Sequence, residues 1–159
     1  MYSFLKSKPI VDAAPRIRRI IDLTTPNMPT VNDGRNARRY NRSISVVIAD
    51  WDPEKGPDLS RLGFGFTIDL SDTGFALLTQ FVPQTPDNIV GFYLPHTEIG
   101  EPSYFHVEFI GYSQKVQGFK RISYRVKEFL NENHGCKSSL LTPKLIEILG
   151  HTAGKGVDG

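Results

Sequence analysis

The sequence predicts an all-β fold with minor α content: a six-stranded antiparallel β-barrel, followed by a C-terminal helix and preceded by a flexible basic N-terminal arm. Apolar and polar residues alternate with period two in segments between residues 43 and 129, and turn-forming residues separate these segments. Ten Phe and six Tyr suit a pleated, half-buried surface. Because no helical pattern intervenes between the strands, a closed or nearly closed antiparallel barrel is favoured.

Six segments carry the strand pattern. In the first, Ile44, Val46 and Ile48 alternate with smaller residues, which predicts a half-buried strand that ends near Trp51. The others span residues 64–70, 75–81, 88–94, 104–112 with a continuation to 116, and 119–129. Gln117-Gly118 predicts a hairpin turn between the last two strands.

Two short helices are expected outside the barrel. Asp12 or a neighbour caps the first, and Pro15 fits an early helical position. Thr142 as N-cap and Pro143 at the first helical position start a second helix over residues 144–149, which packs on the barrel. The expected units are an arm at 1–34, a barrel at 35–130, a linker and helix at 131–153, and a disordered tail at 154–159.

Charge is distributed unevenly along the chain. Residues 1–42 carry nine Lys/Arg against three Asp, whereas residues 43–159 carry ten Lys/Arg against fourteen Asp/Glu. A basic arm on a mildly acidic body indicates an anionic partner that the arm contacts. The plain alternative is a basic tail that only improves solubility.

Several function classes find no support in the sequence. No apolar run reaches the roughly 18–20 residues that cross a bilayer, and the N-terminus lacks the apolar stretch of a secretory signal. The single cysteine, Cys136, excludes an internal disulfide framework and favours a cytoplasmic location. The four histidines are far apart, so no metal site is expected. No nucleophile, base and orienting group can be assembled, so an enzyme is not expected.

Two arginines four residues apart precede the first strand. Arg38 and Arg42 carry planar, permanently charged guanidinium groups. Such a group donates two parallel hydrogen bonds to guanine O6 and N7 or to phosphate oxygens. Arg35 and Arg39 have the same spacing, so a second register is open.

A second motif ends the next strand. The Asp69 carboxylate can accept hydrogen bonds from guanine N1–H and the exocyclic amine, which adenine cannot offer. Ser71 points to the same side as Asp69 in a strand, and Gly74 allows a positive φ or a close ligand approach. Taken alone, this motif is more typical of an ordinary Asx/Ser turn between strands.

Arg38-x-x-x-Arg42, a strand, and then Asp69-x-Ser71-x-x-Gly74 resembles the PilZ domain, the bacterial receptor module for cyclic di-GMP. The resemblance covers roughly residues 35–130. It implies that the arginine pair lies in a loop that folds over the ligand, and that the Asp, Ser and Gly shape a floor on the barrel surface. The expected ligand residues are therefore Arg38, Arg42, Asp69, Ser71 and Gly74, with Arg35 and Arg39 as additional contacts.

The function that this resemblance implies is a cytoplasmic cyclic di-GMP receptor. Ligand would order residues 33–42 and change the affinity for an unidentified downstream protein; no cofactor, metal, nucleic-acid polymer or membrane span is expected. One alternative is a PilZ-like interaction module that binds no nucleotide. A barrel that binds single-stranded nucleic acid is a further alternative, which the acidic body disfavours.

Overall fold

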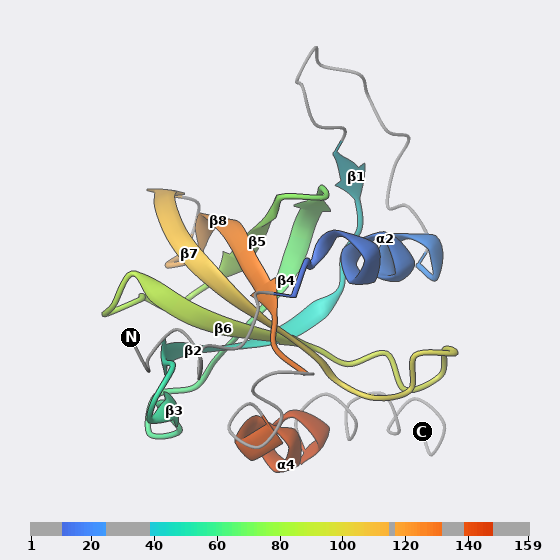
Figure 1. The fold of residues 1–159 in the computed structure, drawn as a ribbon. Helices are drawn as coiled ribbons and strands as arrows, with labels where there is room; N and C mark the ends of the chain where they lie inside the picture. The colour runs from blue at the N-terminus through green and yellow to red at the C-terminus, as the bar shows by residue number, and fades with distance from the viewer. Residues whose placement is uncertain (1–10, 25–38, 115–116, 132–138, 148–159) are drawn as a thin grey trace, which may run out of the picture.

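Six antiparallel strands form a closed ring in the computed structural model, which describes residues 11–24, 39–114, 117–131 and 139–147 (Figure 1). In spatial order they are β2 (Ser45–Asp52), β4 (Gly63–Leu70), β5 (Gly74–Thr79), β8 (Lys120–Phe129), β7 (Ser103–Gln114) and β6 (Asp87–Phe92). The ring closes because β2 pairs with both β4 and β6. The six-stranded barrel predicted from the sequence is confirmed.

Two very short strands extend the barrel sheet. β1 (Tyr40–Asn41) pairs antiparallel with the end of β4, where Tyr40 lies opposite Leu70 and Asn41 opposite Asp69. β3 (Gly56–Pro57) folds back on the end of β2. The β1 pairing brings the middle of the Arg38–Arg42 motif alongside the Asp69 motif.

The barrel interior is filled with aromatic and branched side chains. Phe92 packs edge-on against both Phe75 and Phe105, with ring centroids 5.5 Å apart in each pair. Helix α2 (Ala14–Asp22) lies across one end of the barrel and joins this core (Figure 1). Its three fully buried residues, at the i, i+3, i+4 spacing of a helix face, are Ile17, Ile20 and Ile21.

At the start of α2, Pro15 occupies an early helical position, as predicted. The N-cap is Ala13, the neighbour of Asp12, and has no side-chain capping bond, while Asp12 Oδ1 accepts from the Ala14 N–H at 3.0 Å. The turn at Gln117-Gly118 is also confirmed, because both residues have positive φ, 57° and 83°. Parts of the predicted arm, at 1–10 and 25–34, and all of the predicted tail lie outside the described residues.

The prediction of a half-buried first strand is wrong, because β2 is buried on both faces. Its outward side chains Val47, Ala49 and Trp51 form a second apolar cluster with the chain after the barrel. That chain forms a 3₁₀ turn, η1 (Ser139–Leu141), and a short helix, α4 (Thr142–Leu145), which contribute Leu141 and Leu145 to the cluster.

The prediction that Thr142 is the N-cap of α4 is wrong, because Leu141 occupies that position. The Thr142 hydroxyl instead forms a hydrogen bond of 2.5 Å with the Tyr104 hydroxyl of β7. None of the helices in the described parts of the chain is both long enough and apolar enough to cross a bilayer.

Candidate functional site

Asp69 lies on the outer face of the barrel wall, at the end of β4. A bulge between Thr67 and Asp69 shifts the register against β5, and Asp69 then lies opposite Ala76 while its neighbour Leu70 points into the core. The Asp69 side chain retains only 9% of its exposure. A carboxylate this buried needs charged or hydrogen-bonding partners.

Two arginines supply those partners. Arg39 Nη1 lies 2.7 Å from Asp69 Oδ1, and Arg121 Nη2 lies 3.3 Å from Asp69 Oδ2. Arg39 enters from the chain just before β1, whereas Arg121 is on β8, two strands away from β4. The outer wall therefore holds one carboxylate between two guanidinium groups.

The turn that follows Asp69 is built by Ser71. The Ser71 hydroxyl accepts hydrogen bonds from the Thr73 and Gly74 N–H groups at 3.3 and 3.2 Å, and the Ser71 N–H donates to the Gly74 carbonyl at 2.8 Å. Ser71 is itself buried, with 3% exposure. In this structure it fixes the turn and thereby the end of β4.

Gly74 is required at its position by the neighbouring strand. It does not have a positive φ, but a Cβ placed on it would lie 2.4 Å from the Tyr124 carbonyl oxygen of β8. Any larger residue would therefore push β5 and β8 apart. The sequence suggested a close approach of ligand at Gly74. In the structure, the close approach is that of the β5 backbone to the β8 backbone.

Arg42 faces away from this wall and toward α2. It retains 7% exposure, and its guanidinium donates to the Ile21 carbonyl at 3.3 Å and to the Thr24 hydroxyl at 3.1 Å. A third hydrogen bond, of 3.1 Å, goes to the Asn41 carbonyl. Arg42 thus satisfies the Ile21 carbonyl at the C-terminal end of α2, where a cation is favoured.

Tyr40 connects the helix with the wall. Arg18 of α2 donates to the Tyr40 hydroxyl at 2.8 Å and lies 3.5 Å from Asp72 in the Ser71 turn. The pKa of Arg18 is raised, first by the hydrogen bond with Tyr40 and then by the attraction of Tyr40 and Asp72. The guanidinium carbon of Arg42 lies 5.8 Å from the Tyr40 ring centroid. A change at the wall can therefore reach α2 through Tyr40.

The structure brings Asp69, Ser71 and Gly74 together at one turn and adds Arg39 to them, whereas it directs Arg42 to the helix. Arg35 and Arg38 lie outside the described residues. Sequence reasoning missed Arg121, which stands 52 residues from Asp69 and belongs to no local motif. Only the strand order of the closed barrel reveals that the two are close.

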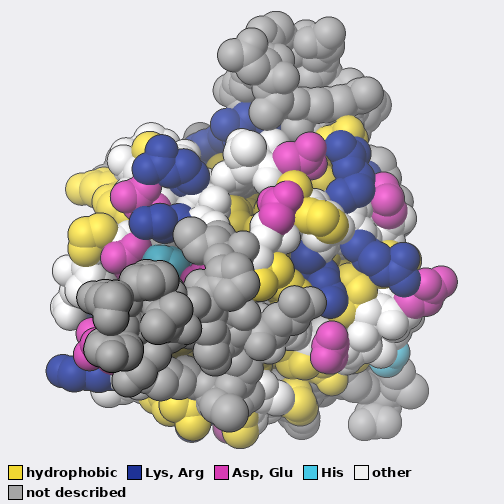
Figure 2. Space-filling view, in the orientation of Figure 1, with side chains coloured by type: hydrophobic (Ala, Val, Ile, Leu, Met, Phe, Trp, Pro, Cys, Tyr) yellow, Lys and Arg dark blue, Asp and Glu magenta, His cyan; other side chains and the backbone are white. Residues whose placement is uncertain are grey.

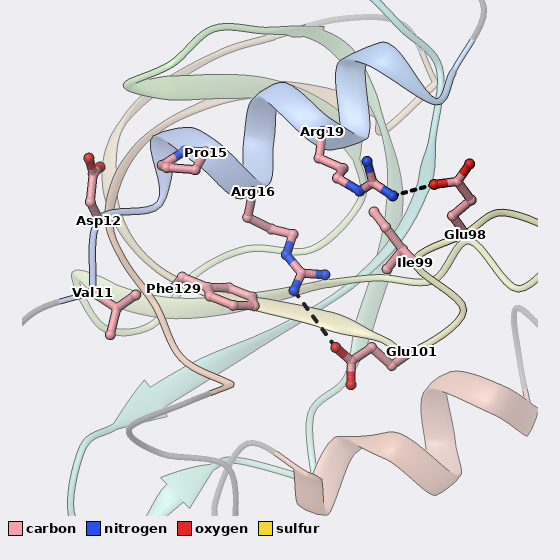
Figure 3. A pocket seen from close by; sticks show the side chains of 9 residues that line it. All are labelled: Val11, Asp12, Pro15, Arg16, Arg19, Glu98, Ile99, Glu101 and Phe129. Carbon is pink, nitrogen blue, oxygen red and sulfur yellow. Dashed lines mark hydrogen bonds and ion pairs between the residues drawn. The ribbon is translucent and has the colours of Figure 1, made fainter.

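A separate pocket lies between α2 and the loop before β7 (Figure 3). Arg19 pairs with Glu98 at 2.5 Å, and Arg16 lies 3.7 Å from Glu101 and over the Phe129 ring. The arginines are matched by the two glutamates, so this pocket lacks the excess positive charge that an anion would need. Figure 2 likewise shows basic and acidic side chains interleaved over the described part of that face.

No family model matches the chain, and no curated protein matches its sequence. Among solved structures, the fold is similar to that of the Bacillus subtilis inhibitor of motility (MotI/DgrA), with a TM-score of 0.45 and 11% sequence identity. The match covers 72% of this chain and 52% of that one, so the chain spans about half of that protein's length. A likeness at this level establishes neither a shared family nor a shared ligand.

Proposed function

We propose that the chain is a cyclic di-GMP receptor whose ligand lies on the outer barrel wall at Asp69. The observation that carries the proposal is the Asp69 carboxylate held between the guanidinium groups of Arg39 and Arg121 at 2.7 and 3.3 Å. The carboxylate can accept from guanine N1–H and the exocyclic amine, and the guanidinium groups can donate to phosphate oxygens. The resemblance of the two sequence motifs to the PilZ domain points to the same ligand.

Binding in this scheme is an exchange of partners. Arg39 leaves a carboxylate for a phosphate oxygen, while Asp69 takes up the guanine edge, so no buried charge is left without a counterpart. Arg38 acts from the preceding chain, as the resemblance implies. For Arg42 to contact the ligand, its hydrogen bonds to the neutral Ile21 carbonyl and Thr24 hydroxyl must be replaced by bonds to phosphate oxygens, in which both partners are charged.

Residues 39–42 already lie against the barrel, through the pairing of β1 with β4 and the ion pair between Arg39 and Asp69. The ligand would therefore act by exchanging partners within this stretch and by loosening the hold of Arg42 on α2. A change of this kind exposes or covers a surface for a downstream protein. Because the ligand carries two negative charges, its association should be fast at low ionic strength and weaken as salt is added.

Calorimetric titration with cyclic di-GMP tests the site. Asp69→Ala should weaken binding at least about tenfold, since hydrogen bonds to a charged group contribute roughly 1.5–3 kcal/mol. Glu108→Ala is the matched control, because Glu108 is also a carboxylate paired with an arginine on the outer wall, and it should leave the affinity unchanged. Cyclic di-AMP should bind poorly. Equal affinity for both nucleotides would remove the guanine-reading role of Asp69.

A second candidate function is a PilZ-like interaction module that binds no nucleotide. The observation that favours it is that Asp69 and Arg42 already have partners within the protein, so the motif residues can hold the wall and α2 together without a ligand. The same titration separates the receptor from the interaction module. If no heat is detected up to about millimolar cyclic di-GMP, a concentration that still reveals very weak complexes, the interaction module is favoured.

A further inference from the structure

We propose that Arg121 of β8 is a further ligand residue, a phosphate-binding arginine supplied by the barrel wall itself. This inference rests on the proposed function and names a contact that neither sequence motif contains. The arginines of the motif belong to the chain that leads into the barrel. Arg121 differs from them because it is anchored in a ten-residue strand with partners on both sides.

The strand register places Arg121 on the same outer face as Asp69. Asp69 lies opposite Ala76, and Ala76 lies opposite Ser123, so these three form one row across β4, β5 and β8. Arg121 is two residues from Ser123 and therefore points to the same face. Its guanidinium reaches back across β5 to Asp69.

The row that starts at Asp69 contains only small residues beyond the carboxylate. After Ala76 and Ser123 it ends at Gly111 of β7. Arg121 stands in the adjacent row, next to Leu78 of β5. Ala76 itself is buried, and the Arg121 side chain crosses β5 to reach Asp69, so a planar base can contact this row of small residues once Arg121 has turned away from Asp69.

The charges around Asp69 do not balance within the described residues. One carboxylate faces two guanidinium groups, which leaves one excess positive charge on this part of the wall. Arg121 is the more weakly held of the two, at 3.3 Å against 2.7 Å for Arg39, and its side chain is 29% exposed. It can therefore turn to a phosphate oxygen while Asp69 receives the guanine edge.

Arg125 provides a matched comparison on the same strand and face. It lies four residues after Arg121 and forms an ion pair with Glu108, so that pair carries no excess charge. Arg121 and Arg125 lie two residues to either side of Ser123 in the register, but Arg121 forms its ion pair with Asp69 and Arg125 forms its own with Glu108. The loss of Arg125 tests the general effect of removing a positive charge from β8.

The experiment is a calorimetric titration of cyclic di-GMP into the wild type, Arg121→Ala, Arg121→Lys and Arg125→Ala. Arg121→Ala should raise the Kd about tenfold or more, and Arg121→Lys should raise it less because the charge is retained. Arg125→Ala should stay within about twofold of the wild type. If the wild type binds and Arg121→Ala matches Arg125→Ala, the role of Arg121 is refuted while the proposed function stands. If the wild type does not bind, the proposed function itself fails.

A double-mutant cycle with Asp69→Asn separates a ligand contact from a role in positioning Asp69. An arginine that contacts phosphate should still lose affinity when it is removed from the Asp69→Asn protein. If Arg121→Ala has no effect in that background, Arg121 acts only through Asp69 and the proposal is overturned. Circular dichroism melting of each variant checks that the barrel is intact.

Discussion

The outer wall at Asp69 and the barrel end under α2 each receive one arginine from the same short stretch of chain. Arg39 forms an ion pair with Asp69, and its side chain remains 37% exposed. Arg42, three residues later, retains 7% exposure and donates to carbonyl and hydroxyl groups at the end of α2. One short stretch of chain therefore serves two surroundings, an ion pair with a partly exposed arginine and a buried helix cap.

This difference indicates which interactions a ligand can exchange at low cost. A partly exposed ion pair contributes little to stability, because water and salt already weaken it. A buried guanidinium that satisfies several acceptors contributes more, and its removal leaves those acceptors without partners. The wall is therefore suited to exchange with a ligand, whereas Arg42 mainly stabilises the fold until a stronger acceptor arrives.

Gly74→Ala should cause the largest loss of stability, and it acts on the outer wall without removing a hydrogen bond of Arg42. The added methyl group meets the Tyr124 carbonyl at 2.4 Å, and forced overlap in a packed site costs about 1–3 kcal/mol. Urea unfolding measures the loss. Gly111→Ala is the control, since nothing lies within 4 Å of a Cβ at that position. Equal stability of the two variants would contradict the close contact between β5 and β8.

Arg42→Ala should lower the free energy of unfolding by about 2 kcal/mol, because it removes hydrogen bonds to the Ile21 carbonyl and the Thr24 hydroxyl. Arg39→Ala should cost less than about 1 kcal/mol, because the Arg39 side chain is 37% exposed and Arg121 still pairs with the buried Asp69 carboxylate. Chemical unfolding of the two variants and the wild type, without ligand, measures both losses. A loss for Arg39→Ala as large as that for Arg42→Ala would erase the distinction between the two sites.

A further prediction concerns how stability changes at alkaline pH through Tyr124, which belongs to neither site and donates a hydrogen bond of 2.6 Å to Asn88. Burial, and secondly the negative charge of Asp50, raise the pKa of Tyr124 above the ordinary value of 10.0. The folded state therefore holds the phenol proton more tightly than the unfolded state. The free energy of unfolding is unaffected by this proton below pH 10, and it falls as the pH rises further.

Unfolding free energies of the wild type and Tyr124→Phe between pH 8 and about 11 test this prediction, because that range brackets the ordinary tyrosine pKa. The decline above pH 10 should be shallower in Tyr124→Phe. Some decline should persist, because burial also raises the pKa of Tyr104. Identical slopes would show that Tyr124 does not drive the alkaline loss.

The sequence was sufficient for the barrel because its strands follow a local rule, the alternation of apolar and polar residues with turns between them. Local capping likewise predicted α2 through Asp12 and Pro15. The features that the sequence did not predict depend on contacts between distant segments. The outer face of β2 is buried only because η1 and α4 pack on it, and the Thr142 hydroxyl bonds with Tyr104 rather than capping its helix.

The same limit applied to the candidate site. Asp69, Ser71 and Gly74 are close in sequence, and their turn was expected. The contact between Arg121 and Asp69 requires the order of strands in the closed barrel, and the burial of Arg42 requires α2 to dock across its end. Neither follows from a local pattern.

The most direct test of the central claim is an amide NMR spectrum recorded while cyclic di-GMP is added. The proposal predicts shifts in residues 39–42, 69–74 and 121–123, which surround the wall, and little change around Trp51 in the second apolar cluster. Shifts confined to the pocket between α2 and the loop before β7, or no shifts at all at millimolar ligand, would contradict a nucleotide site at Asp69.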